Sequence, residues 1–401
     1  MTLSKRAVAL HKEYKGKLSM EVKMPLNNLE DLSLAYSPGV AEPCKEIQNN
    51  RDLVYDYTIK GNLVAVVSDG SAVLGLGNIG AEASLPVMEG KAALFKRFSG
   101  IDAVPLCLNT QDPEEIINIV KSIEPSFGGI NLEDIAAPNC FIIEERLKKE
   151  MNIPVFHDDQ HGTAIVTAAA LINSLLIVNK RIEDIRVVIN GAGAAGIAVV
   201  KLLASMGVKH MIICDSKGAI YTGREEGMNS TKDDIALITN KQKQSGLLAE
   251  IMKNTDVFIG VSAANVVTKD MVATMNEDAI IFAMANPVPE VSYEDALSGG
   301  ARIFGTGRSD LPNQINNILA FPGIFRGALN VRASEINEEM KKAAVYAIAK
   351  IIKPEELHEE YVVPSSFDER VVEHVSDAVG KAAIISGAVK EAITKEVYLN
   401  I

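Results

Sequence analysis

Two pairs of acidic residues in the first half of the chain could together hold a metal ion. Glu133 and Asp134 follow one short apolar run, and Asp158 and Asp159 follow another. If these runs are neighbouring parallel strands, the carboxylates converge at the carboxyl edge of the sheet, where open α/β sheets bind ligands. Four carboxylates in one crevice repel one another unless a cation offsets their charge. Oxygen ligands of this kind favour Mg²⁺ or Mn²⁺.

The histidines beside the second acidic pair keep a zinc site open as an alternative. His157 and His161 flank the two aspartates, and imidazole nitrogen is a common zinc ligand. A zinc site would leave the acidic residues without a role, so the ligand types favour an oxygen-only site.

The chain contains two G-x-G-x-x-G sequences, and only the second has the context of a dinucleotide site. The first, residues 75–80, lies well beyond the end of its preceding apolar run, and Pro86 is expected to interrupt a following helix. The second directly follows the run 186–189 and opens a helical stretch, so its backbone N–H groups can bind a pyrophosphate. The residues of this second turn are Gly191, Ala192, Gly193, Ala194, Ala195 and Gly196.

An acidic residue beyond this turn bears on the choice of cofactor. Asp215 ends the next apolar run, 19 residues after Gly196, where a carboxylate can accept hydrogen bonds from ribose hydroxyls. It would repel a 2′-phosphate, which favours NAD over NADP. Lys217 could offset that repulsion, so NADP stays possible.

Alternating apolar runs and helical stretches predict two α/β sheets that position these groups. The strands expected in the first half are 63–67, 103–108, 129–132 and 153–156, and those in the second half are 186–189, 211–214, 257–260, 280–283 and 302–304. Helices are expected over 86–98, 114–122, 139–149, 335–352 and 369–395. We therefore expect residues 1–160 to form an N-terminal α/β domain for substrate and metal. Residues 161–401 are expected to form a doubly wound Rossmann domain with C-terminal helices.

Length and composition narrow the class of protein. At 401 residues the chain is longer than one ordinary core requires, and its net charge of −12 opposes nucleic-acid binding. Four scattered cysteines without C-x-x-C spacing indicate neither a disulfide framework nor a zinc knuckle. The sequence shows no secretory signal pattern and no uninterrupted apolar run of about 18 residues. We expect a cytoplasmic protein without a membrane partner.

Together with several further motifs, these residues resemble the malic enzyme family in its shorter bacterial form. The resemblance runs from about residue 36 to residue 323 and covers most of the chain. The motifs that carry it are Tyr36-Ser-Pro-Gly-Val40, Ser68-Asp-Gly70 with Leu74-Gly-Leu-Gly77, Gly90-Lys91, Leu132-Glu-Asp134, His157-Asp-Asp-Gln-His-Gly-Thr-Ala164, the turn at 191–196, Ala285-Asn-Pro287 and Asn316-Asn-Ile-Leu-Ala-Phe-Pro-Gly323.

The resemblance implies metal-dependent oxidative decarboxylation of L-malate to pyruvate and CO₂ with reduction of NAD(P), and decarboxylation of oxaloacetate besides. It implies that Lys91 is the general base, Tyr36 the general acid, and Asp158 a support for the base. The metal ligands that it implies are Glu133, Asp134 and Asp159. On composition alone, Lys91 and Tyr36 would pass for an ordinary helix lysine and loop tyrosine.

The same resemblance implies that Asn286 and Asn317 face the substrate or the nicotinamide, with Lys91 as a further substrate contact. A base must lose its proton, so Lys91 needs a pKa depressed by burial or by neighbouring charge. We expect a homodimer or a higher homo-oligomer.

One position departs from the family pattern. Where larger members carry an arginine that binds a substrate carboxylate, this chain has Ala72. Ser71, backbone amides of the glycine-rich loop, or a second subunit could replace that arginine. Two other functions stay open: a malolactic-type reaction, in which NAD stays bound and lactate leaves, and an NAD-binding regulator without turnover.

Overall fold

The computed structural model describes residues 2–73 and 75–389, and its first sheet confirms the strands expected in the first half. Four parallel strands lie in the order β2-β1-β3-β4. Their bounds are β1 Leu63–Ser68, β2 Asp102–Cys107, β3 Gly129–Leu132 and β4 Val155–His157. Because β1 and β3 are buried along their whole length, they read as continuous apolar runs, as parallel strands covered on both faces do.

The register of this sheet places the acidic pairs side by side. Leu132 at the end of β3 is paired with Val67 of β1 and with His157 of β4. Glu133 and Asp158 are the next residues along β3 and β4, and neighbouring strands lie roughly 4.8 Å apart. The expectation that the two acidic pairs meet at one carboxyl edge is therefore confirmed.

The second sheet has six strands in the order β10-β9-β8-β5-β6-β7. The bounds are β5 Arg186–Asn190, β6 His210–Asp215, β7 Gly218–Ala219, β8 Val257–Gly260, β9 Ala279–Ala283 and β10 Ala301–Thr306. All pair in parallel except the short edge strand β7, which is antiparallel to β6. The chain leaves β5 toward β6 on one side and returns to β8 on the other, so the expected doubly wound sheet has its topological switch point at β5.

The long helix α8 (Asp158–Val178) connects the two sheets. By length and composition it is the one described helix that could cross a membrane, but 67% of its most apolar window is buried inside the protein. Its residues join one core with β1, β4 and the second sheet. Small residues such as Ala168, Ala169 and Ala170 let neighbouring elements approach it closely.

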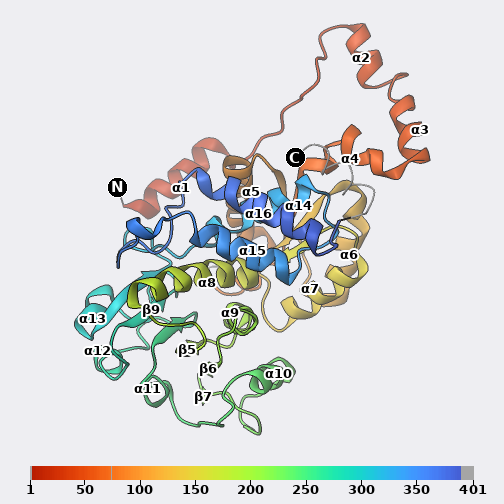
Figure 1. Ribbon diagram of the computed structural model, residues 1–401. Helices are drawn as coiled ribbons and strands as arrows, with labels where there is room; N and C mark the ends of the chain where they lie inside the picture. The colour runs from red at the N-terminus through yellow and green to blue at the C-terminus, as the bar shows by residue number, and fades with distance from the viewer. Residues whose placement is uncertain (1, 74, 390–401) are drawn as a thin grey trace.

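Helices near the carboxyl terminus pack against one another and against α8, which connects the two sheets (Figure 1). These are α14 (Phe321–Asn330), α15 (Glu338–Ala349) and α16 (Arg370–Ile385). Phe321 and Phe325 of α14 pack edge-on against Phe95 of α5 (Ala81–Ser99), with ring centroids 4.7 and 5.3 Å from that of Phe95. The helix predicted over 369–395 ends at Ile385, and residues 390–395 of that prediction lie outside the described residues.

The expectation that Pro86 interrupts a helix is wrong. Helix α5 runs from Ala81 to Ser99 with Pro86 inside it. A proline inside a helix costs about 3 kcal/mol, but one face of α5 buries Met88, Ala92 and Phe95 in the core. This burial offsets the lost hydrogen bond.

The other helices lie around the two sheets and along the amino-terminal segment. They are α1 Leu3–Tyr14, α2 Leu29–Ala35, α3 Ala41–Asn49, α4 Val54–Tyr57, α6 Pro113–Ile123, α7 Asn139–Glu150, α9 Ala194–Ser205, α10 Ser230–Ile238, α11 Leu248–Ile251, α12 Lys269–Val272 and α13 Tyr293–Ser298. Most lie against the body, whereas α2 and α3 project away from it (Figure 1).

Candidate active site

A buried lysine lies between the two acidic pairs. Lys91 extends from α5, is 8% exposed, and has its Nζ 2.6 Å from Oδ2 of Asp158 and 2.8 Å from Oε1 of Glu133. The same ammonium lies 4.3 Å from the centroid of the Phe321 ring. The group predicted as the base and the group predicted to support it are therefore in direct contact.

The charges around Lys91 decide its protonation. Burial by itself lowers the pKa of Lys91, but the carboxylates of Asp158, Glu133 and Asp159 outweigh burial, and the pKa is raised. A depressed pKa was expected for Lys91 from the sequence, and with only the protein's own side chains around it the pKa is raised instead. Burial also raises the pKa of Asp158 to about 6, against the opposing effect of Lys91.

Three carboxylates form the one group of possible metal ligands that converges within the described part of the chain. One ligand atom from each of Glu133, Asp134 and Asp159 lies within 4.8 Å of the others. Burial, together with repulsion from the three neighbouring aspartates, raises the pKa of Glu133 well above its usual value, although Lys91 opposes the rise. A divalent cation would relieve this repulsion, so the residues fit the predicted Mg²⁺ or Mn²⁺.

The backbone and a neighbouring amide hold these carboxylates in place. The backbone N–H of Asp134 donates to Oδ2 of Asp159 at 2.7 Å, and the Asn131 amide donates to Oε2 of Glu133 at 2.8 Å. Asn131 is fully buried on β3. Both bonds leave further lone pairs on the carboxylates for a cation.

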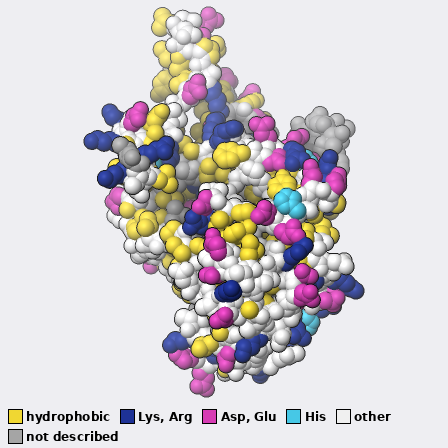
Figure 2. Space-filling view, turned by 90° about the vertical axis from the view of Figure 1, so that its left-hand side faces the viewer, with side chains coloured by type: hydrophobic (Ala, Val, Ile, Leu, Met, Phe, Trp, Pro, Cys, Tyr) yellow, Lys and Arg dark blue, Asp and Glu magenta, His cyan; other side chains and the backbone are white. Residues whose placement is uncertain are grey.

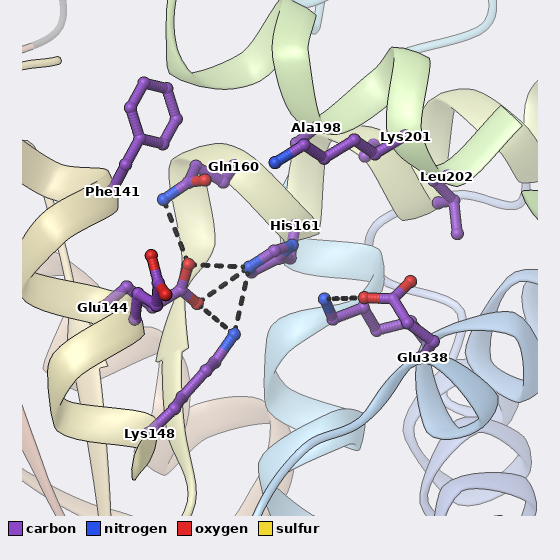
Figure 3. A pocket seen from close by; sticks show the side chains of 12 residues that line it. Phe141, Glu144, Lys148, Gln160, His161, Ala198, Lys201, Leu202 and Glu338 are labelled. Atoms are coloured by element: carbon purple, nitrogen blue, oxygen red, sulfur yellow. Dashed lines mark hydrogen bonds and ion pairs between the residues drawn. The ribbon is translucent and has the colours of Figure 1, made fainter. Parts of the chain in front are cut away.

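The histidines do not belong to this group of converging ligands. His161 turns away toward Glu144 of α7, with Nε2 2.8 Å from Oε1 (Figure 3). Lys148 and Gln160 bind the same carboxylate, and burial lowers the pKa of His161 to about 3. His157 is fully buried, with Nδ1 3.8 Å from Oδ2 of Asp159. These side chains fix the start of α8, which carries both aspartates.

Two more residues fix the position of Asp158. The side-chain amide of Asn317 donates a short hydrogen bond to Oδ2 of Asp158. A Cβ at Gly162 would lie 2.0 Å from the other oxygen of Asp158, so only glycine fits at that position. Asn317 was expected to face the substrate or the nicotinamide. In the structure its amide nitrogen contacts Asp158, which pairs with Lys91.

The glycine-rich loop after β1 lies beside the acidic group. The backbone N–H of Ala72, the position at which the resemblance implied a missing arginine, donates to the carbonyl of Asp134 at 2.9 Å. The Ser71 hydroxyl donates to Oδ1 of Asp69 and accepts from the N–H of Ala136. The proton of Ser71 is thus already engaged within the protein, which weakens its case as a substitute for the arginine.

Asn286 lies between this loop and the second sheet. It follows β9, is exposed, and adopts a cis peptide bond to Pro287. A Cβ at Gly75 would lie 2.8 Å from its carbonyl oxygen, and one at Gly307 would lie 3.0 Å from its amide nitrogen. Asn286 therefore stands where the two sheets face each other.

The second glycine turn has the geometry expected of a dinucleotide site. It connects β5 to α9, which begins at Ala194. A Cβ at Gly196 would lie 1.8 Å from the carbonyl oxygen of Gly191, and Gly191 itself has a φ of +117°. Both glycines are required for the tight turn that points backbone N–H groups at a pyrophosphate.

Asp215 ends β6 as expected, but two positively charged side chains already pair with its carboxylate. Arg224 donates from both terminal nitrogens to the two carboxylate oxygens, and Lys232 Nζ lies 2.6 Å from Oδ2. The backbone N–H of Lys217 supplies a further hydrogen bond at 2.9 Å. Although burial opposes it, these donors lower the pKa of Asp215 to about 2. The Lys217 side chain, which could offset the repulsion between Asp215 and a 2′-phosphate, pairs with Glu226 at 2.6 Å.

The structure does not bring Tyr36 to the other predicted site residues. It caps the C-terminus of α2 and is 70% exposed, and its backbone bonds with Leu32 and Val40 stay within the same segment of chain. Among the described residues, the contacts of Lys91 come from the body of the molecule.

Sequence patterns alone missed several residues of the site. Phe321 lies far along the chain from Lys91, and Arg224 and Lys232 stand in ordinary loop and helical sequence. Asn131 was missed as well, although it lies two residues from its partner Glu133. The motif containing Phe321 was noticed only as part of the resemblance. The odd polar residue inside the apolar run at 129–132 was the one local signal that could have indicated Asn131.

Comparisons with known proteins cover nearly the whole chain. The model of the malic enzyme N-terminal domain matches residues 15–148, and that of the malic enzyme NAD binding domain matches residues 160–385. The bifunctional malic/malolactic enzyme of Bacillus subtilis is 61% identical over 99% of this chain and 97% of its own. The NAD-dependent malic enzyme of Geobacillus stearothermophilus is 54% identical over 94% of this chain and 78% of its own.

Solved structures agree with these relatives. The crystal structure of the NAD-dependent malic enzyme from Thermotoga maritima has a TM-score of 0.91 and 50% identity, over 93% of this chain and 98% of that chain. Proteins named NADP-dependent malic enzymes are also among the relatives. By its domain models, its relatives and its fold, the chain belongs to the malic enzyme family.

Proposed function

We propose that the protein oxidises L-malate with a nicotinamide cofactor and decarboxylates the product to pyruvate and CO₂. The observation that carries this proposal is the buried contact of Lys91 with Asp158 beside the three converging carboxylates. In the proposed reaction Lys91 is the proton acceptor, and the carboxylates beside it hold a cation. A regulator without turnover would have no need for these buried charges.

Each residue has a distinct part in the proposed reaction. Lys91 accepts the proton of the malate 2-hydroxyl, while Asp158 and Asn317 hold the lysine in position. Tyr36 donates a proton to C3 after CO₂ has left. A cation bound by Glu133, Asp134 and Asp159 supplies a Lewis acid for the 2-oxygen and offsets the charge that holds the proton on Lys91.

The test is reduction of the cofactor by malate. We expect absorbance of NADH to rise when the purified protein is given L-malate, NAD and Mn²⁺, with one pyruvate formed per NADH. Oxaloacetate should also be decarboxylated with the same metal. No malate-dependent NADH in any combination of NAD, NADP, Mg²⁺ and Mn²⁺ would rule the proposal out.

A malolactic reaction is the second candidate, because the Bacillus subtilis relative carries the name of a bifunctional malic/malolactic enzyme. In that reaction NAD stays bound and lactate leaves. Measuring lactate and free NADH in the same malate incubation separates the two reactions: lactate without NADH indicates the malolactic one.

For the cofactor, we infer a preference for NAD over NADP. Asp215 ends β6, where a carboxylate in this type of fold can accept hydrogen bonds from a ribose, but Arg224 and Lys232 place positive charge beside it. Relatives of both cofactor types therefore leave NADP as a usable second cofactor. We also expect a homo-oligomer in the cytoplasm.

A further inference from the structure

The amino-terminal segment contains an arm without a core of its own. We call residues 24–50, which include α2 and α3, the arm. None of its residues is buried. It projects beyond α4 from the body in Figure 1, and forms the narrow projection in Figure 2, where apolar side chains are visible. Its attachment includes a hydrogen bond from Tyr57 to Glu46.

Large apolar side chains on the arm face solvent. They are Met24, Leu26, Leu29, Leu32, Leu34, Tyr36 and Val40, with exposed fractions from 38% to 81%. Full burial of one such side chain stabilises by roughly 1.5–3 kcal/mol, and isolated helices shorter than about 12 residues are marginal in water. The arm therefore requires a surface that the described part of its own chain does not provide.

The candidate site lacks a proton donor for C3 among the described residues that contact Lys91. A proton donor for C3 must come within about 3 Å of a substrate held at Lys91. Tyr36, which the proposed function assigns to that step, is on the arm, whereas Lys91 is inside the body. Leu76 and Leu85, 69% and 40% exposed, belong to the glycine-rich loop that contacts Asp134 and to the helix α5 that carries Lys91. They offer an apolar rim on which the arm can dock.

We propose that the arm of one subunit docks on the site rim of a second copy of the chain and delivers Tyr36 to the Lys91 of that copy. This inference rests on the proposed function. In a two-fold dimer both arms would dock in the same way. The two symmetry-related contacts would then complete both catalytic sites. An arm of this length also matches the roughly 20–30 residues that each partner contributes to a standard interface.

A second copy is favoured over a foreign partner because it supplies the group that the site needs. The tyrosine required at one site is carried, exposed, by every copy of the same chain. It also follows that the active unit is at least a dimer, with each catalytic site shared between two subunits.

The decisive experiment combines two inactive variants. Tyr36→Phe and Lys91→Ala are purified with different tags, and subunits are exchanged or co-expressed. If Tyr36 acts in the other subunit, each mixed dimer has one intact site, and random pairing restores about a quarter of wild-type pyruvate formation. If Tyr36 acts in its own subunit, no site is intact and no activity returns, which would overturn the inference.

A matched control reverses the expected result. The double variant Tyr36→Phe/Lys91→Ala is co-expressed with an equal amount of wild-type chain. With the tyrosine acting across the dimer, mixed dimers have no intact site, and about a quarter of full activity remains. If the tyrosine acts within its own subunit, each wild-type chain keeps an intact site and about half of full activity remains.

The arm is tested separately by its oligomeric state. Leu34→Asp should shift the protein toward monomer in analytical ultracentrifugation and lower turnover. The control is Leu237→Asp on α10. Leu237 is 67% exposed and Leu34 is 66% exposed, so the control should leave the oligomeric state and the turnover unchanged. A wild-type protein that turns over malate as a monomer would overturn the inference alone. A wild-type dimer without malate turnover would instead overturn the proposed function.

Discussion

Nζ of Lys91 and Oδ2 of Asp158 lie 2.6 Å apart, although the two residues are 67 positions apart in the chain. Helix α5 supplies the lysine, and the first residue of α8 supplies the aspartate. Asn317 joins the same oxygen from a third segment. Three segments that are distant in the chain therefore meet at one carboxylate.

Lys91→Ala should abolish malate oxidation, because the hydroxyl proton then has no acceptor. We expect kcat to fall by about 10²–10⁴, the usual contribution of a general base. NADH affinity should be unchanged, and its own fluorescence can report binding without interference, because the chain has no tryptophan. Lys96→Ala is the control: it is on the same helix but exposed and paired with Asp102. Equal losses in the two variants would argue against the role of Lys91.

Tyr36→Phe should separate the two halves of the reaction. If Tyr36 protonates C3, the variant should still reduce oxaloacetate to malate with NADH but should form pyruvate about 10²-fold more slowly. Both partial reactions are measured on the same preparation with metal in excess, and folding is checked by circular dichroism. Equal loss of both would indicate a tyrosine that positions the substrate or Lys91 instead.

Removing the metal should remove activity, because Glu133, Asp134 and Asp159 repel one another when ionised together. Asp159→Asn should raise the concentration of Mn²⁺ needed for half-maximal rate by about 10-fold or more, while NADH binding stays the same. Asp270→Asn, on exposed α12, serves as the control. Full activity after exhaustive chelation would contradict the prediction.

Asp215→Ala should shift the cofactor preference toward NADP. The change removes the carboxylate and releases Arg224 and Lys232, whose charges can then attract a 2′-phosphate. We expect the ratio of kcat/KM for NAD to that for NADP to fall by about 10-fold or more, which corresponds to roughly 1.4 kcal/mol. Arg224→Ala should lower NADP use instead. A ratio that stays constant in both variants would mean that other residues decide the preference.

Gly162→Ala should damage catalysis, because the added Cβ would lie 2.0 Å from Oδ1 of Asp158 and force that side chain to move. Displacement of a group that touches the base by about 1 Å can cost on the order of 10²-fold in rate. Gly380→Ala is the matched control in a helix, where the added Cβ meets only ordinary contacts. Thermal unfolding of both variants separates a loss of catalysis from a loss of fold.

The strands and their ends could be predicted from local sequence. The buried runs that form β1 and β3, and the acids that follow β3 and β4, are read within a few residues of chain because both faces of a parallel strand are apolar. The turn between Gly191 and Gly196 could also be predicted from local sequence, because the spacing of its glycines matches a known fingerprint, although Val261 from a distant segment also packs against it.

What only the tertiary structure decided depends on contacts between distant segments. Pro86 remains inside α5 because the core burial of that helix offsets the lost bond, and Asp215 meets Arg224 and Lys232 because β6 and the residues after it fold back together. Tyr36 carries a family motif, yet its ring faces solvent on the arm. The sequence by itself determined which groups the reaction requires. The fold decided which of them meet within one chain, because distance and burial follow from the packing of elements that are far apart in sequence.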